Sequence, residues 1–340
     1  MNYQHLVADD YIKQTMCFDN STASADVKPL HIAYGIDKNF IFGCGVSISS
    51  ILLNNQNAAF AFHVFVDVMT SDEMNLFSQL AADYNTCINI HIVNCDKLAS
   101  FPTTKNWSVA TYFRFIIGDY FIGRQERILF MDADIMCQGD ISELVTLPLE
   151  DNVAAVVPER DNMWWKSRAI GLDCPMLLNG YFNAGFLLIN VTRWAQEYVS
   201  ARALEMLSDK KISEKLLYLD QDLLNVALAG KVKFIDVKFN TQFSLNYELK
   251  SQFVYPITDD TVLIHFIGPT KPWHAWANYP SVAPFLRAKE NSPWRDKPLQ
   301  QPGNSNYARY SAKHYFKQGN VVAGIKNYLH YILFKINPKR

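Results

Sequence analysis

Short apolar runs alternate with longer segments of helical periodicity between residues 30 and 266. The runs are rich in β-branched and aromatic residues and predict strands at 30–34, 61–66, 88–93, 127–131, 153–157, 181–189 and 262–266. Segments with helical spacing lie between them, at 43–53, 72–84, 109–121, 192–207 and 221–228. Strands that alternate with helices indicate an α/β fold with a mostly parallel sheet and helices on both faces.

The pattern divides the chain into three parts. Residues 1–28 are polar and aperiodic, so we expect an irregular N-terminal arm. Residues 29–280 hold the alternating strands and helices and are expected to form one domain. Residues 281–340 contain a linker or loop at 292–294 and 300–304, followed by a helical pattern, which predicts a helical extension. The apolar residues of that pattern are Val321, Val322, Ile325, Tyr328, Leu329, Ile332, Leu333 and Ile336.

Charge is distributed unevenly along the chain. The formal net charge of the 340 residues is −1, but from Lys297 onward there are eight Lys and Arg residues and no Asp or Glu. The predicted extension is therefore a basic amphipathic helix, which is typical of segments that contact an anionic membrane surface. A helix that packs on the main domain would show the same apolar stripe, and both interpretations stay open. The acidic remainder gives no indication of a nucleic-acid partner.

The sequence shows neither a targeting signal nor a metal-binding cysteine motif. The N-terminus has no basic-then-apolar signal pattern, and no apolar run approaches the roughly 20 residues that span a bilayer. The six cysteines show no metal-binding spacing. We therefore expect a soluble cytoplasmic protein, with peripheral membrane contact left open.

Two acidic residues follow the run at 127–131, where the predicted strand leaves the core. Asp132 and Asp134 are separated by Ala133, and residues i and i+2 of a strand share a face. Both carboxylates can therefore bind one hard divalent cation, Mg²⁺ or Mn²⁺, which in turn can hold a diphosphate. The carboxyl end of a strand is also where open α/β sheets bind ligands. The alternative is a loop or a helix cap, since acids after a strand often have that role.

A second part of this candidate site lies in the segment 265–274. His265 ends the last predicted strand and offers an imidazole nitrogen as a third metal ligand. Gly268 allows the backbone to approach a ligand closely, and Lys271 supplies a cation for a phosphate. A metal ligand, a glycine and a lysine in one segment together suggest a loop that binds a diphosphate.

Polar residues in two further segments are candidates for sugar binding. Asn183 interrupts the apolar run at 181–189, where a buried amide needs a polar partner such as a sugar hydroxyl. Asp220 and Gln221 open a predicted helix, with Asp220 as its N-cap, and can contact a sugar from the helix N-terminus. The structural alternatives are a β-bulge with a hydrogen-bonded Asn183 and a simple helix cap.

The end of the first predicted strand is the candidate nucleotide site. Asp37 and Asn39 follow that strand and can hydrogen-bond a base or a ribose. The chain has neither Gly-x-Gly-x-x-Gly nor a P-loop, so the known dinucleotide and phosphate fingerprints are missing. A turn with helix capping would explain the same residues.

Five segments follow the order found in the retaining glycosyltransferases of family eight, and the chain resembles that family over about residues 30–276. These segments are 34–39, 132–134, 181–185, 219–222 and 265–274. The resemblance implies a GT-A (Rossmann-like) domain that uses a UDP-hexose and Mg²⁺ or Mn²⁺.

The resemblance also implies roles for individual residues. The implied metal ligands are Asp132, Asp134 and His265. The implied nucleotide and diphosphate contacts are Ala33, Gly35, Ile36, Asp37, Asn39, Arg114, Asp132, Ala133, Gly268 and Lys271. The implied catalytic residues, which would line the donor sugar, are Asn183, Asp220 and Gln221.

Within that family, the chain is most similar to the lipopolysaccharide core α-1,3-hexosyltransferases of enteric bacteria. The segments 37–40, 104–107 and 110–114 carry this closer resemblance, together with the basic C-terminal region. It implies transfer of galactose or glucose from a UDP-sugar to a glucose of the lipopolysaccharide outer core, with retention of configuration. Because the acceptor bears lipid, we expect the basic region to meet the cytoplasmic face of the inner membrane.

Several alternatives stay open at the level of the sequence. A non-catalytic binding protein for sugar nucleotides or lipopolysaccharide could use the same fold, as could a family-eight transferase with another acceptor. The residues do not distinguish galactose from glucose, or Mg²⁺ from Mn²⁺. Retention allows either a covalent intermediate or a same-face attack, and the amide of Gln221 is a poor nucleophile.

Overall fold

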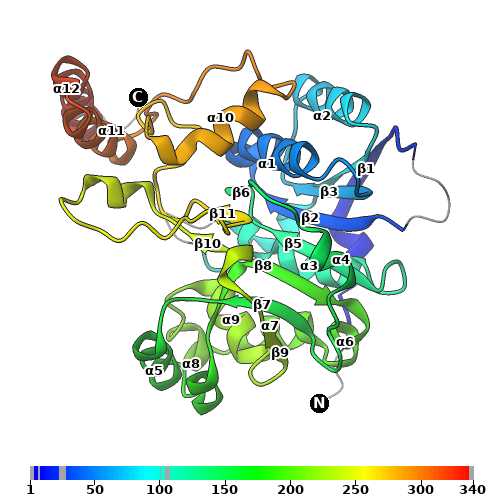
Figure 1. The fold of residues 1–340 in the computed structure, drawn as a ribbon. Coiled ribbons are helices and arrows are strands. Elements are labelled where there is room, and N and C mark those ends of the chain that lie inside the picture. The colour runs from blue at the N-terminus through cyan, green and yellow to red at the C-terminus, as the bar shows by residue number, and fades with distance from the viewer. Residues whose placement is uncertain (1–3, 7, 23–27, 100, 104–107, 337–340) are drawn as a thin grey trace.

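The computed structural model describes residues 4–6, 8–22, 28–99, 101–103 and 108–336, which surround an eight-stranded sheet (Figure 1). The spatial order of the strands is β1-β4-β3-β2-β5-β8-β7-β9. Their bounds are Ile12–Asp19 for β1, Leu30–Ile36 for β2, Phe60–Val66 for β3, Cys87–Val93 for β4, Arg127–Met131 for β5, Ala154–Pro158 for β7, Phe182–Asn190 for β8 and Val232–Phe234 for β9. Every apolar run that predicts a strand forms one, here or in the small sheet described below.

Strand direction changes in the middle of this sheet. β4, β3, β2 and β5 run parallel to one another, whereas β8 is antiparallel to both β5 and β7. β1 is antiparallel to β4 at one edge, and β9 is parallel to β7 at the other. The sheet is therefore mixed, and its parallel half is the half that resembles a nucleotide-binding α/β fold.

Helices cover both faces of the sheet, as the sequence pattern predicts (Figure 1). One face packs against α1 (Ile41–Asn54), α2 (Ser71–Asp83) and α10 (Ala283–Glu290). The other face packs against α3 (Phe113–Tyr120), α6 (Val191–Gln196), α7 (Val199–Ser208) and α9 (Leu219–Ala227). Side chains of a strand alternate between faces, so Ile32 and Tyr34 of β2 lie in the first core and Ala33 lies in the second.

A small second sheet continues from the carboxyl end of β5. It contains β10 (Thr241–Gln242), β11 (Leu263–His265) and β6 (Ile135–Cys137), in the order β10-β11-β6. β6 pairs antiparallel with β11, so that His265 lies opposite Ile135. β6, β9 and β10 are two or three residues long and are not marked by a longer apolar run, which is why the sequence does not predict them, whereas the equally short β11 lies in the apolar run at 262–266.

The C-terminal part forms a helical hairpin beside the sheet (Figure 1). It consists of α11 (Ser305–Lys317) and α12 (Val321–Ile336), and the turn between them has a left-handed backbone at Gly319, with φ of 78°. The remaining α-helices of the described ranges are α4 (Ser142–Thr146), α5 (Asn162–Gly171) and α8 (Lys210–Ser213). No helix within the described ranges combines the length and the apolar character needed to cross a bilayer.

Two predictions of local structure are wrong. The segment 1–28 is not an irregular arm throughout, because Ile12–Asp19 forms β1 and pairs with β4. β1 is a largely exposed edge strand, so it has no apolar run to reveal it. The single helix expected at 192–207 is divided into α6 and α7 at Tyr198, whose left-handed backbone has φ of 50°.

Three histidines form a hydrogen-bonded ladder across β2, β3 and β4. His31 Nδ1 lies 3.0 Å from His63 Nε2, and His63 Nδ1 lies 3.2 Å from His91 Nε2. His91 Nδ1 then lies 3.0 Å from the hydroxyl oxygen of Thr15 on β1. A neutral imidazole has one donor and one acceptor nitrogen, so neutral rings satisfy the ladder. Burial lowers the pKa of all three rings, to about 4 for His91.

Acid should destabilise the sheet through this ladder. The folded pKa of His91 lies below its ordinary value of 6.5, so the contribution is complete above pH 6.5 and is lost as the pH falls toward 4. For His91 alone, the loss between pH 7 and pH 5 is about 2 kcal/mol. We expect His91→Gln to be less stable at pH 7 but to show a shallower decline toward pH 5, measured by urea unfolding. Equal slopes in the two proteins would contradict this assignment.

Candidate active site

The acid pair lies in the turn that connects the large sheet to the small one. β5 ends one residue before Asp132 and β6 begins one residue after Asp134, so the two acids are turn residues and do not belong to one strand. The amide of Asp132 donates to the carbonyl of Gly185 at 2.8 Å, and the amide of Phe266 donates to the carbonyl of Asp134 at 3.0 Å. The two carboxylates converge as predicted, but a hydrogen-bonded turn brings them together and the strand argument is wrong.

Asp132, Asp134 and His265 form a group that can hold a divalent cation. One ligand atom from each residue lies within 4.8 Å of the other two. His265 Nε2 is 3.2 Å from Asp134 Oδ1 and 3.9 Å from Asp132 Oδ2. Two carboxylates and one imidazole suit a cation such as Mg²⁺ or Mn²⁺ that also accepts phosphate oxygens. The three predicted ligands are thus brought together by the fold, and their chemistry fits the ion.

Gly185 on β8 leaves the space that an ion between these ligands needs. A Cβ atom at this position would lie 2.4 Å from Cε1 of His265 and 2.8 Å from Oδ2 of Asp132. Both distances are far below ordinary contact. Any larger residue would therefore push the ligands apart, which explains a glycine inside a buried strand.

A chain of buried amides orients the His265 ring. His265 Nδ1 is 3.0 Å from Asn240 Oδ1, and Asn240 Nδ2 donates to Asn183 Oδ1 at 3.0 Å. Asn183 Nδ2 donates to Glu159 Oε2 at 2.8 Å, while its Oδ1 also accepts from the amide of Gly185. Because each amide is fixed by its neighbours, Nδ1 of the imidazole carries the proton and Nε2 presents its lone pair to a cation.

Lys271 places a positive charge at the same site. Its ammonium group donates to Asp134 Oδ2 and, at 2.9 Å, to the carbonyl of Phe266. Burial alone would raise the pKa of the Asp134 carboxyl, but the ammonium group of Lys271 holds that pKa below its ordinary value. The lysine therefore lies beside a candidate metal ligand, where it can reach a phosphate group bound to the ion.

Arg114 on α3 connects the acid pair to the predicted sugar residues. Its Nε lies 2.9 Å from Asp220 Oδ2, its Nη2 lies 3.4 Å from Asp132 Oδ1, and the residue is buried. Nη1 donates to the carbonyl of Ala184 at 2.5 Å. Burial raises the pKa of both carboxyl groups, and Arg114 counteracts that rise. Arg114, predicted to reach the donor, thus contacts two acids of the protein and sets their spacing.

The start of α9 differs from the prediction. Tyr218 is the N-cap and Asp220 lies in the first turn, so the assignment of Asp220 as the N-cap is wrong. Asp220 instead accepts from the hydroxyl of Thr111 at 2.5 Å. Gln221 Oε1 accepts from the amide of Ala184 at 3.1 Å, beside the metal group. The helix therefore delivers both side chains to the site from its first turn.

The predicted nucleotide segment follows the carboxyl end of β2, and the acid pair follows the carboxyl end of the neighbouring parallel strand β5. Asp37 Oδ1 accepts from the amide of Asn39 at 2.9 Å, and Asp37 Oδ2 accepts from the hydroxyl of Ser108 at 2.8 Å. The capping interpretation is thus correct for Asp37. The side chain of Asn39 is exposed and can reach a ligand.

The small and apolar residues predicted at the site can contribute only backbone groups. Ala33, Ile36 and Ala133 are buried in the cores on the two sides of the sheet. Gly35 is packed against α3, because a Cβ there would lie 3.0 Å from a side chain of that helix. Gly268 follows β11 with φ of 86°, a left-handed backbone that favours glycine.

Sequence reasoning missed the residues that support the site. Asn240 precedes β10 and Glu159 follows β7, and neither lies in a pattern that marks its role. Asp222 is fully buried and accepts from Arg168 at 2.8 Å and from the hydroxyl of Tyr181 at 2.6 Å. The available signal for Asp222 was its place in an apolar helix, since a buried acid requires partners.

Two family models cover nearly the whole chain. Residues 31–277 match "Glycosyl transferase family 8", and residues 279–335 match "Glycosyl transferase family 8 C-terminal". The first match includes the acid pair, the Asn183 segment, the start of α9 and the loop after β11. The chain therefore belongs to glycosyl transferase family 8 and is a glycosyltransferase.

Two bacterial relatives are similar over almost their whole length. The lipopolysaccharide 1,3-galactosyltransferase of Salmonella typhimurium is 49% identical over 329 residues, which are 96% of this chain and 97% of the relative. The lipopolysaccharide glucosyltransferase WaaO of Escherichia coli is 48% identical over the same shares of the two chains. The segment 104–107, which contributes to the predicted resemblance to such enzymes, lies outside the described residues.

A solved structure confirms the expected GT-A fold. The galactosyltransferase LgtC, in complex with donor and acceptor sugar analogs, superposes with a TM-score of 0.67 at 22% identity. The superposition covers 79% of this chain and 100% of that chain.

A side chain at position 185 should weaken metal binding. We expect Gly185→Ala to weaken Mn²⁺ binding roughly 10- to 100-fold, because the added Cβ displaces His265 and Asp132. Isothermal titration calorimetry measures the change. The matched control is Gly303→Ala, where a Cβ meets nothing within 4 Å. A folded Gly185→Ala protein with wild-type Mn²⁺ affinity would show that the ion does not lie between these ligands.

Proposed function

We propose that this protein transfers galactose or glucose from a UDP-sugar to a glucose of the lipopolysaccharide outer core, forming an α-1,3 linkage with retention of configuration. The observation that carries the proposal is the position of Lys271 beside the Asp132, Asp134 and His265 group. This arrangement suits a diphosphate held by a cation. The identity of 49% to a lipopolysaccharide 1,3-galactosyltransferase supports the acceptor and the linkage.

The residues of the site would have different roles in binding and activating the donor. When Mg²⁺ or Mn²⁺ is bound, it acts as a Lewis acid on the diphosphate. Asp132, Asp134 and His265 would hold that ion through two carboxylate oxygens and one imidazole nitrogen. Lys271 can leave its carboxylate for the phosphate oxygens and balance the charge that develops on the departing UDP. Asn39, exposed at the end of β2, would contact the uridine.

The surroundings of the sugar favour attack from the face that UDP leaves. Asp220 is buried and held by Arg114 and Thr111, so it is not free to act as a nucleophile. Gln221 is a neutral amide and a poor nucleophile. A phosphate oxygen of the departing UDP would then take the proton of the acceptor hydroxyl, while Asn183 and Gln221 orient the sugar.

Release of UDP tests this function. The protein is incubated with lipopolysaccharide truncated after its first outer-core glucose and with UDP-galactose or UDP-glucose, with and without Mg²⁺ or Mn²⁺. We expect metal-dependent release from one donor. Asp132→Asn should lower the rate roughly 100-fold or more, because several kcal/mol of charge stabilisation is lost. Asp140→Asn, at an exposed acid that keeps its bond to the Ser142 amide, should retain full activity.

Other results would change the proposal in defined ways. Turnover only with a different acceptor would keep the transferase and replace lipopolysaccharide. Binding of UDP without turnover on any acceptor would favour a non-catalytic binding protein. Metal-dependent transfer by Asp132→Asn at the wild-type rate would refute the metal assignment.

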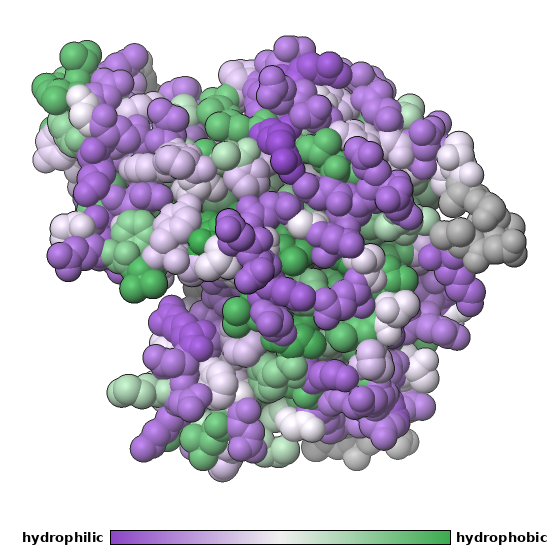
Figure 2. Space-filling view, in the orientation of Figure 1, coloured by the Kyte–Doolittle hydropathy of each residue, from purple (hydrophilic) through white to green (hydrophobic). Residues whose placement is uncertain are grey.

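The surface of the α11–α12 hairpin suggests where in the cell the enzyme acts. We propose that this hairpin binds the anionic cytoplasmic face of the inner membrane. α12 packs on α11 through a face that buries Gly324 and Asn327. Its other face exposes Val321, Val322, Ile325, Tyr328, Leu329, Ile332, Leu333 and Ile336. Figure 2 shows this apolar patch at the α12 end of the molecule. The exposed cations Lys313, Lys317, Lys326 and Lys335 lie on the same hairpin, and each contributes roughly 1 kcal/mol near an anionic surface.

Replacing apolar residues on the exposed face of α12 by acidic ones should release the protein from membranes. The double variant Leu329→Glu/Leu333→Glu removes two exposed apolar side chains and adds repulsion from anionic lipid. We expect its binding to vesicles that contain phosphatidylglycerol to fall about tenfold or more in a sedimentation assay. Val254→Glu, at a residue that is 91% exposed outside the hairpin, is the control and should still bind. A wild-type dimer that the double variant abolishes, with no vesicle binding, would assign the face to a second copy.

A further inference from the structure

The loop that carries Gly268 and Lys271 lies between the metal group and the C-terminal hairpin. On one side, Lys271 contacts Asp134. On the other side, the loop contacts α11, which belongs to the segment matched by the C-terminal family model. This second contact is polar and is centred on His314 of α11, whose exposed fraction is 0%.

His314 connects α11 to three other segments. Its Nδ1 lies 2.7 Å from the hydroxyl of Tyr279, and its Nε2 lies 3.0 Å from Asn246 Oδ1 and 3.3 Å from Thr270 Oγ1. Thr270 also donates to Asn246 Oδ1 at 2.8 Å. Burial lowers the pKa of His314 to about 4, so the neutral ring donates from Nε2 and accepts from Tyr279. Thr270 directly precedes Lys271, so these bonds hold the backbone from which the lysine extends.

A second residue of α11 supports the loop beyond Lys271. Tyr307 packs against the rings of His274 and Trp276, with centroid distances of 5.0 and 5.9 Å. His274 Nδ1 in turn accepts from the backbone amide of Lys271 at 3.1 Å. The lysine is therefore held on both sides by residues that rest on α11.

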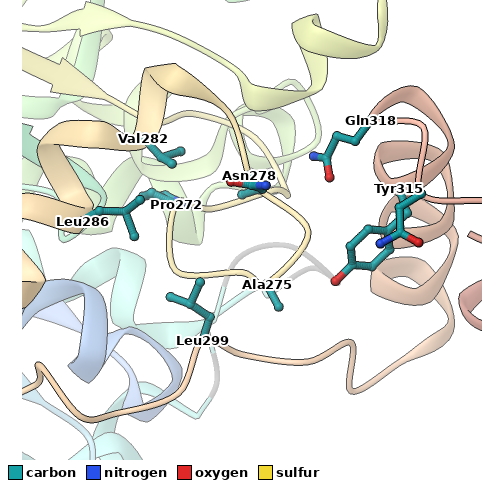
Figure 3. A pocket seen from close by; sticks show the side chains of 10 residues that line it. Pro272, Ala275, Asn278, Val282, Leu286, Leu299, Tyr315 and Gln318 are labelled. Carbon is teal, nitrogen blue, oxygen red and sulfur yellow. The ribbon is translucent and has the colours of Figure 1, made fainter. Parts of the chain in front are cut away.

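A cavity lies at the junction between the loop and the helix, and Figure 3 shows side chains that line it. A cavity of about 310 Å³ is lined by Pro272 and Ala275 from the loop and by Tyr315 and Gln318 at the end of α11. Trp273, in the same loop, packs in the first core, whereas Thr270 and Lys271 before it are tied to α11 by the His314 hydrogen bonds and, through His274, by Tyr307.

We propose that α11 is part of the donor site, and that His314 is a positioning residue that holds the 268–271 loop for the diphosphate. The inference rests on the proposed function in one respect, namely that this loop binds the diphosphate of a UDP-sugar. Loss of the His314 bonds would release Thr270 and with it Lys271. The uridine contacts at the end of β2 belong to another segment and would remain.

Binding of UDP and of uridine separates this role from a general structural one. Isothermal titration calorimetry in Mn²⁺ compares the full-length wild type with His314→Gln and His314→Asn. Gln places its amide near the Nε2 position and can still donate to Asn246, whereas Asn reaches only the Nδ1 position near Tyr279. We expect the Kd for UDP to rise about tenfold in the Asn variant and to stay within about twofold in the Gln variant. The Kd for uridine should not change in either.

Two further variants complete the test. Thr270→Val removes the hydroxyl that contacts Asn246 and His314 without changing α11, and it should weaken UDP binding as the Asn variant does. His330→Gln, at an exposed histidine of α12, is the matched control and should bind UDP like the wild type.

Three results would overturn the inference. Equal UDP affinities in the Asn and Gln variants would show that the bond to the loop is not needed, as would wild-type UDP affinity in Thr270→Val. An equal loss of UDP and uridine affinity would indicate general damage to the site. A wild-type protein that does not bind UDP would instead overturn the proposed function, on which the assignment of the loop depends.

Discussion

The pairing of β11 with β6 is the interaction on which the site depends. It places His265 opposite Ile135, next to Asp134, and so joins segments that are far apart in the chain. The loop that follows β11 leaves from the same point, which is why Lys271 reaches Asp134. A sheet of only three short strands thus carries His265, a candidate metal ligand, and Lys271 to the end of β5.

Charge balance allows the acids of the site to be buried together. Arg114 lies between Asp132 and Asp220, and Lys271 pairs with Asp134. An unpaired carboxylate buried as deeply as Asp134 or Asp220 would cost several kcal/mol, so each of these two acids depends on its cation. In the proposed function, Asp134 would help to hold the ion and Lys271 would be the cation available to the phosphate, so the pair would serve both metal and diphosphate binding.

The C-terminal segment is continuous with the site although a separate family model matches it. The two matches meet near residue 278, yet α11 buries His314 among residues from the catalytic side of that boundary. The opposite surface of the hairpin, on α12, is apolar and exposed. One hairpin therefore presents a polar contact to the loop at residues 268–271 and an apolar face to the outside.

The sequence by itself determined the buried strands that lie in apolar runs and the chemistry of the site, because such runs and acidic, imidazole and amino side chains can be recognised without knowledge of contacts. It marked Asp132, Asp134, His265 and Lys271 as one site. It could not predict β1, whose side chains are largely exposed, or β6 and β10, which are two or three residues long and are not marked by a longer apolar run. Only the tertiary structure decided that Asn240 and Glu159 orient the imidazole and that His314 supports the loop. Those contacts join distant segments, and their closeness depends on strand pairing and packing that no local pattern encodes.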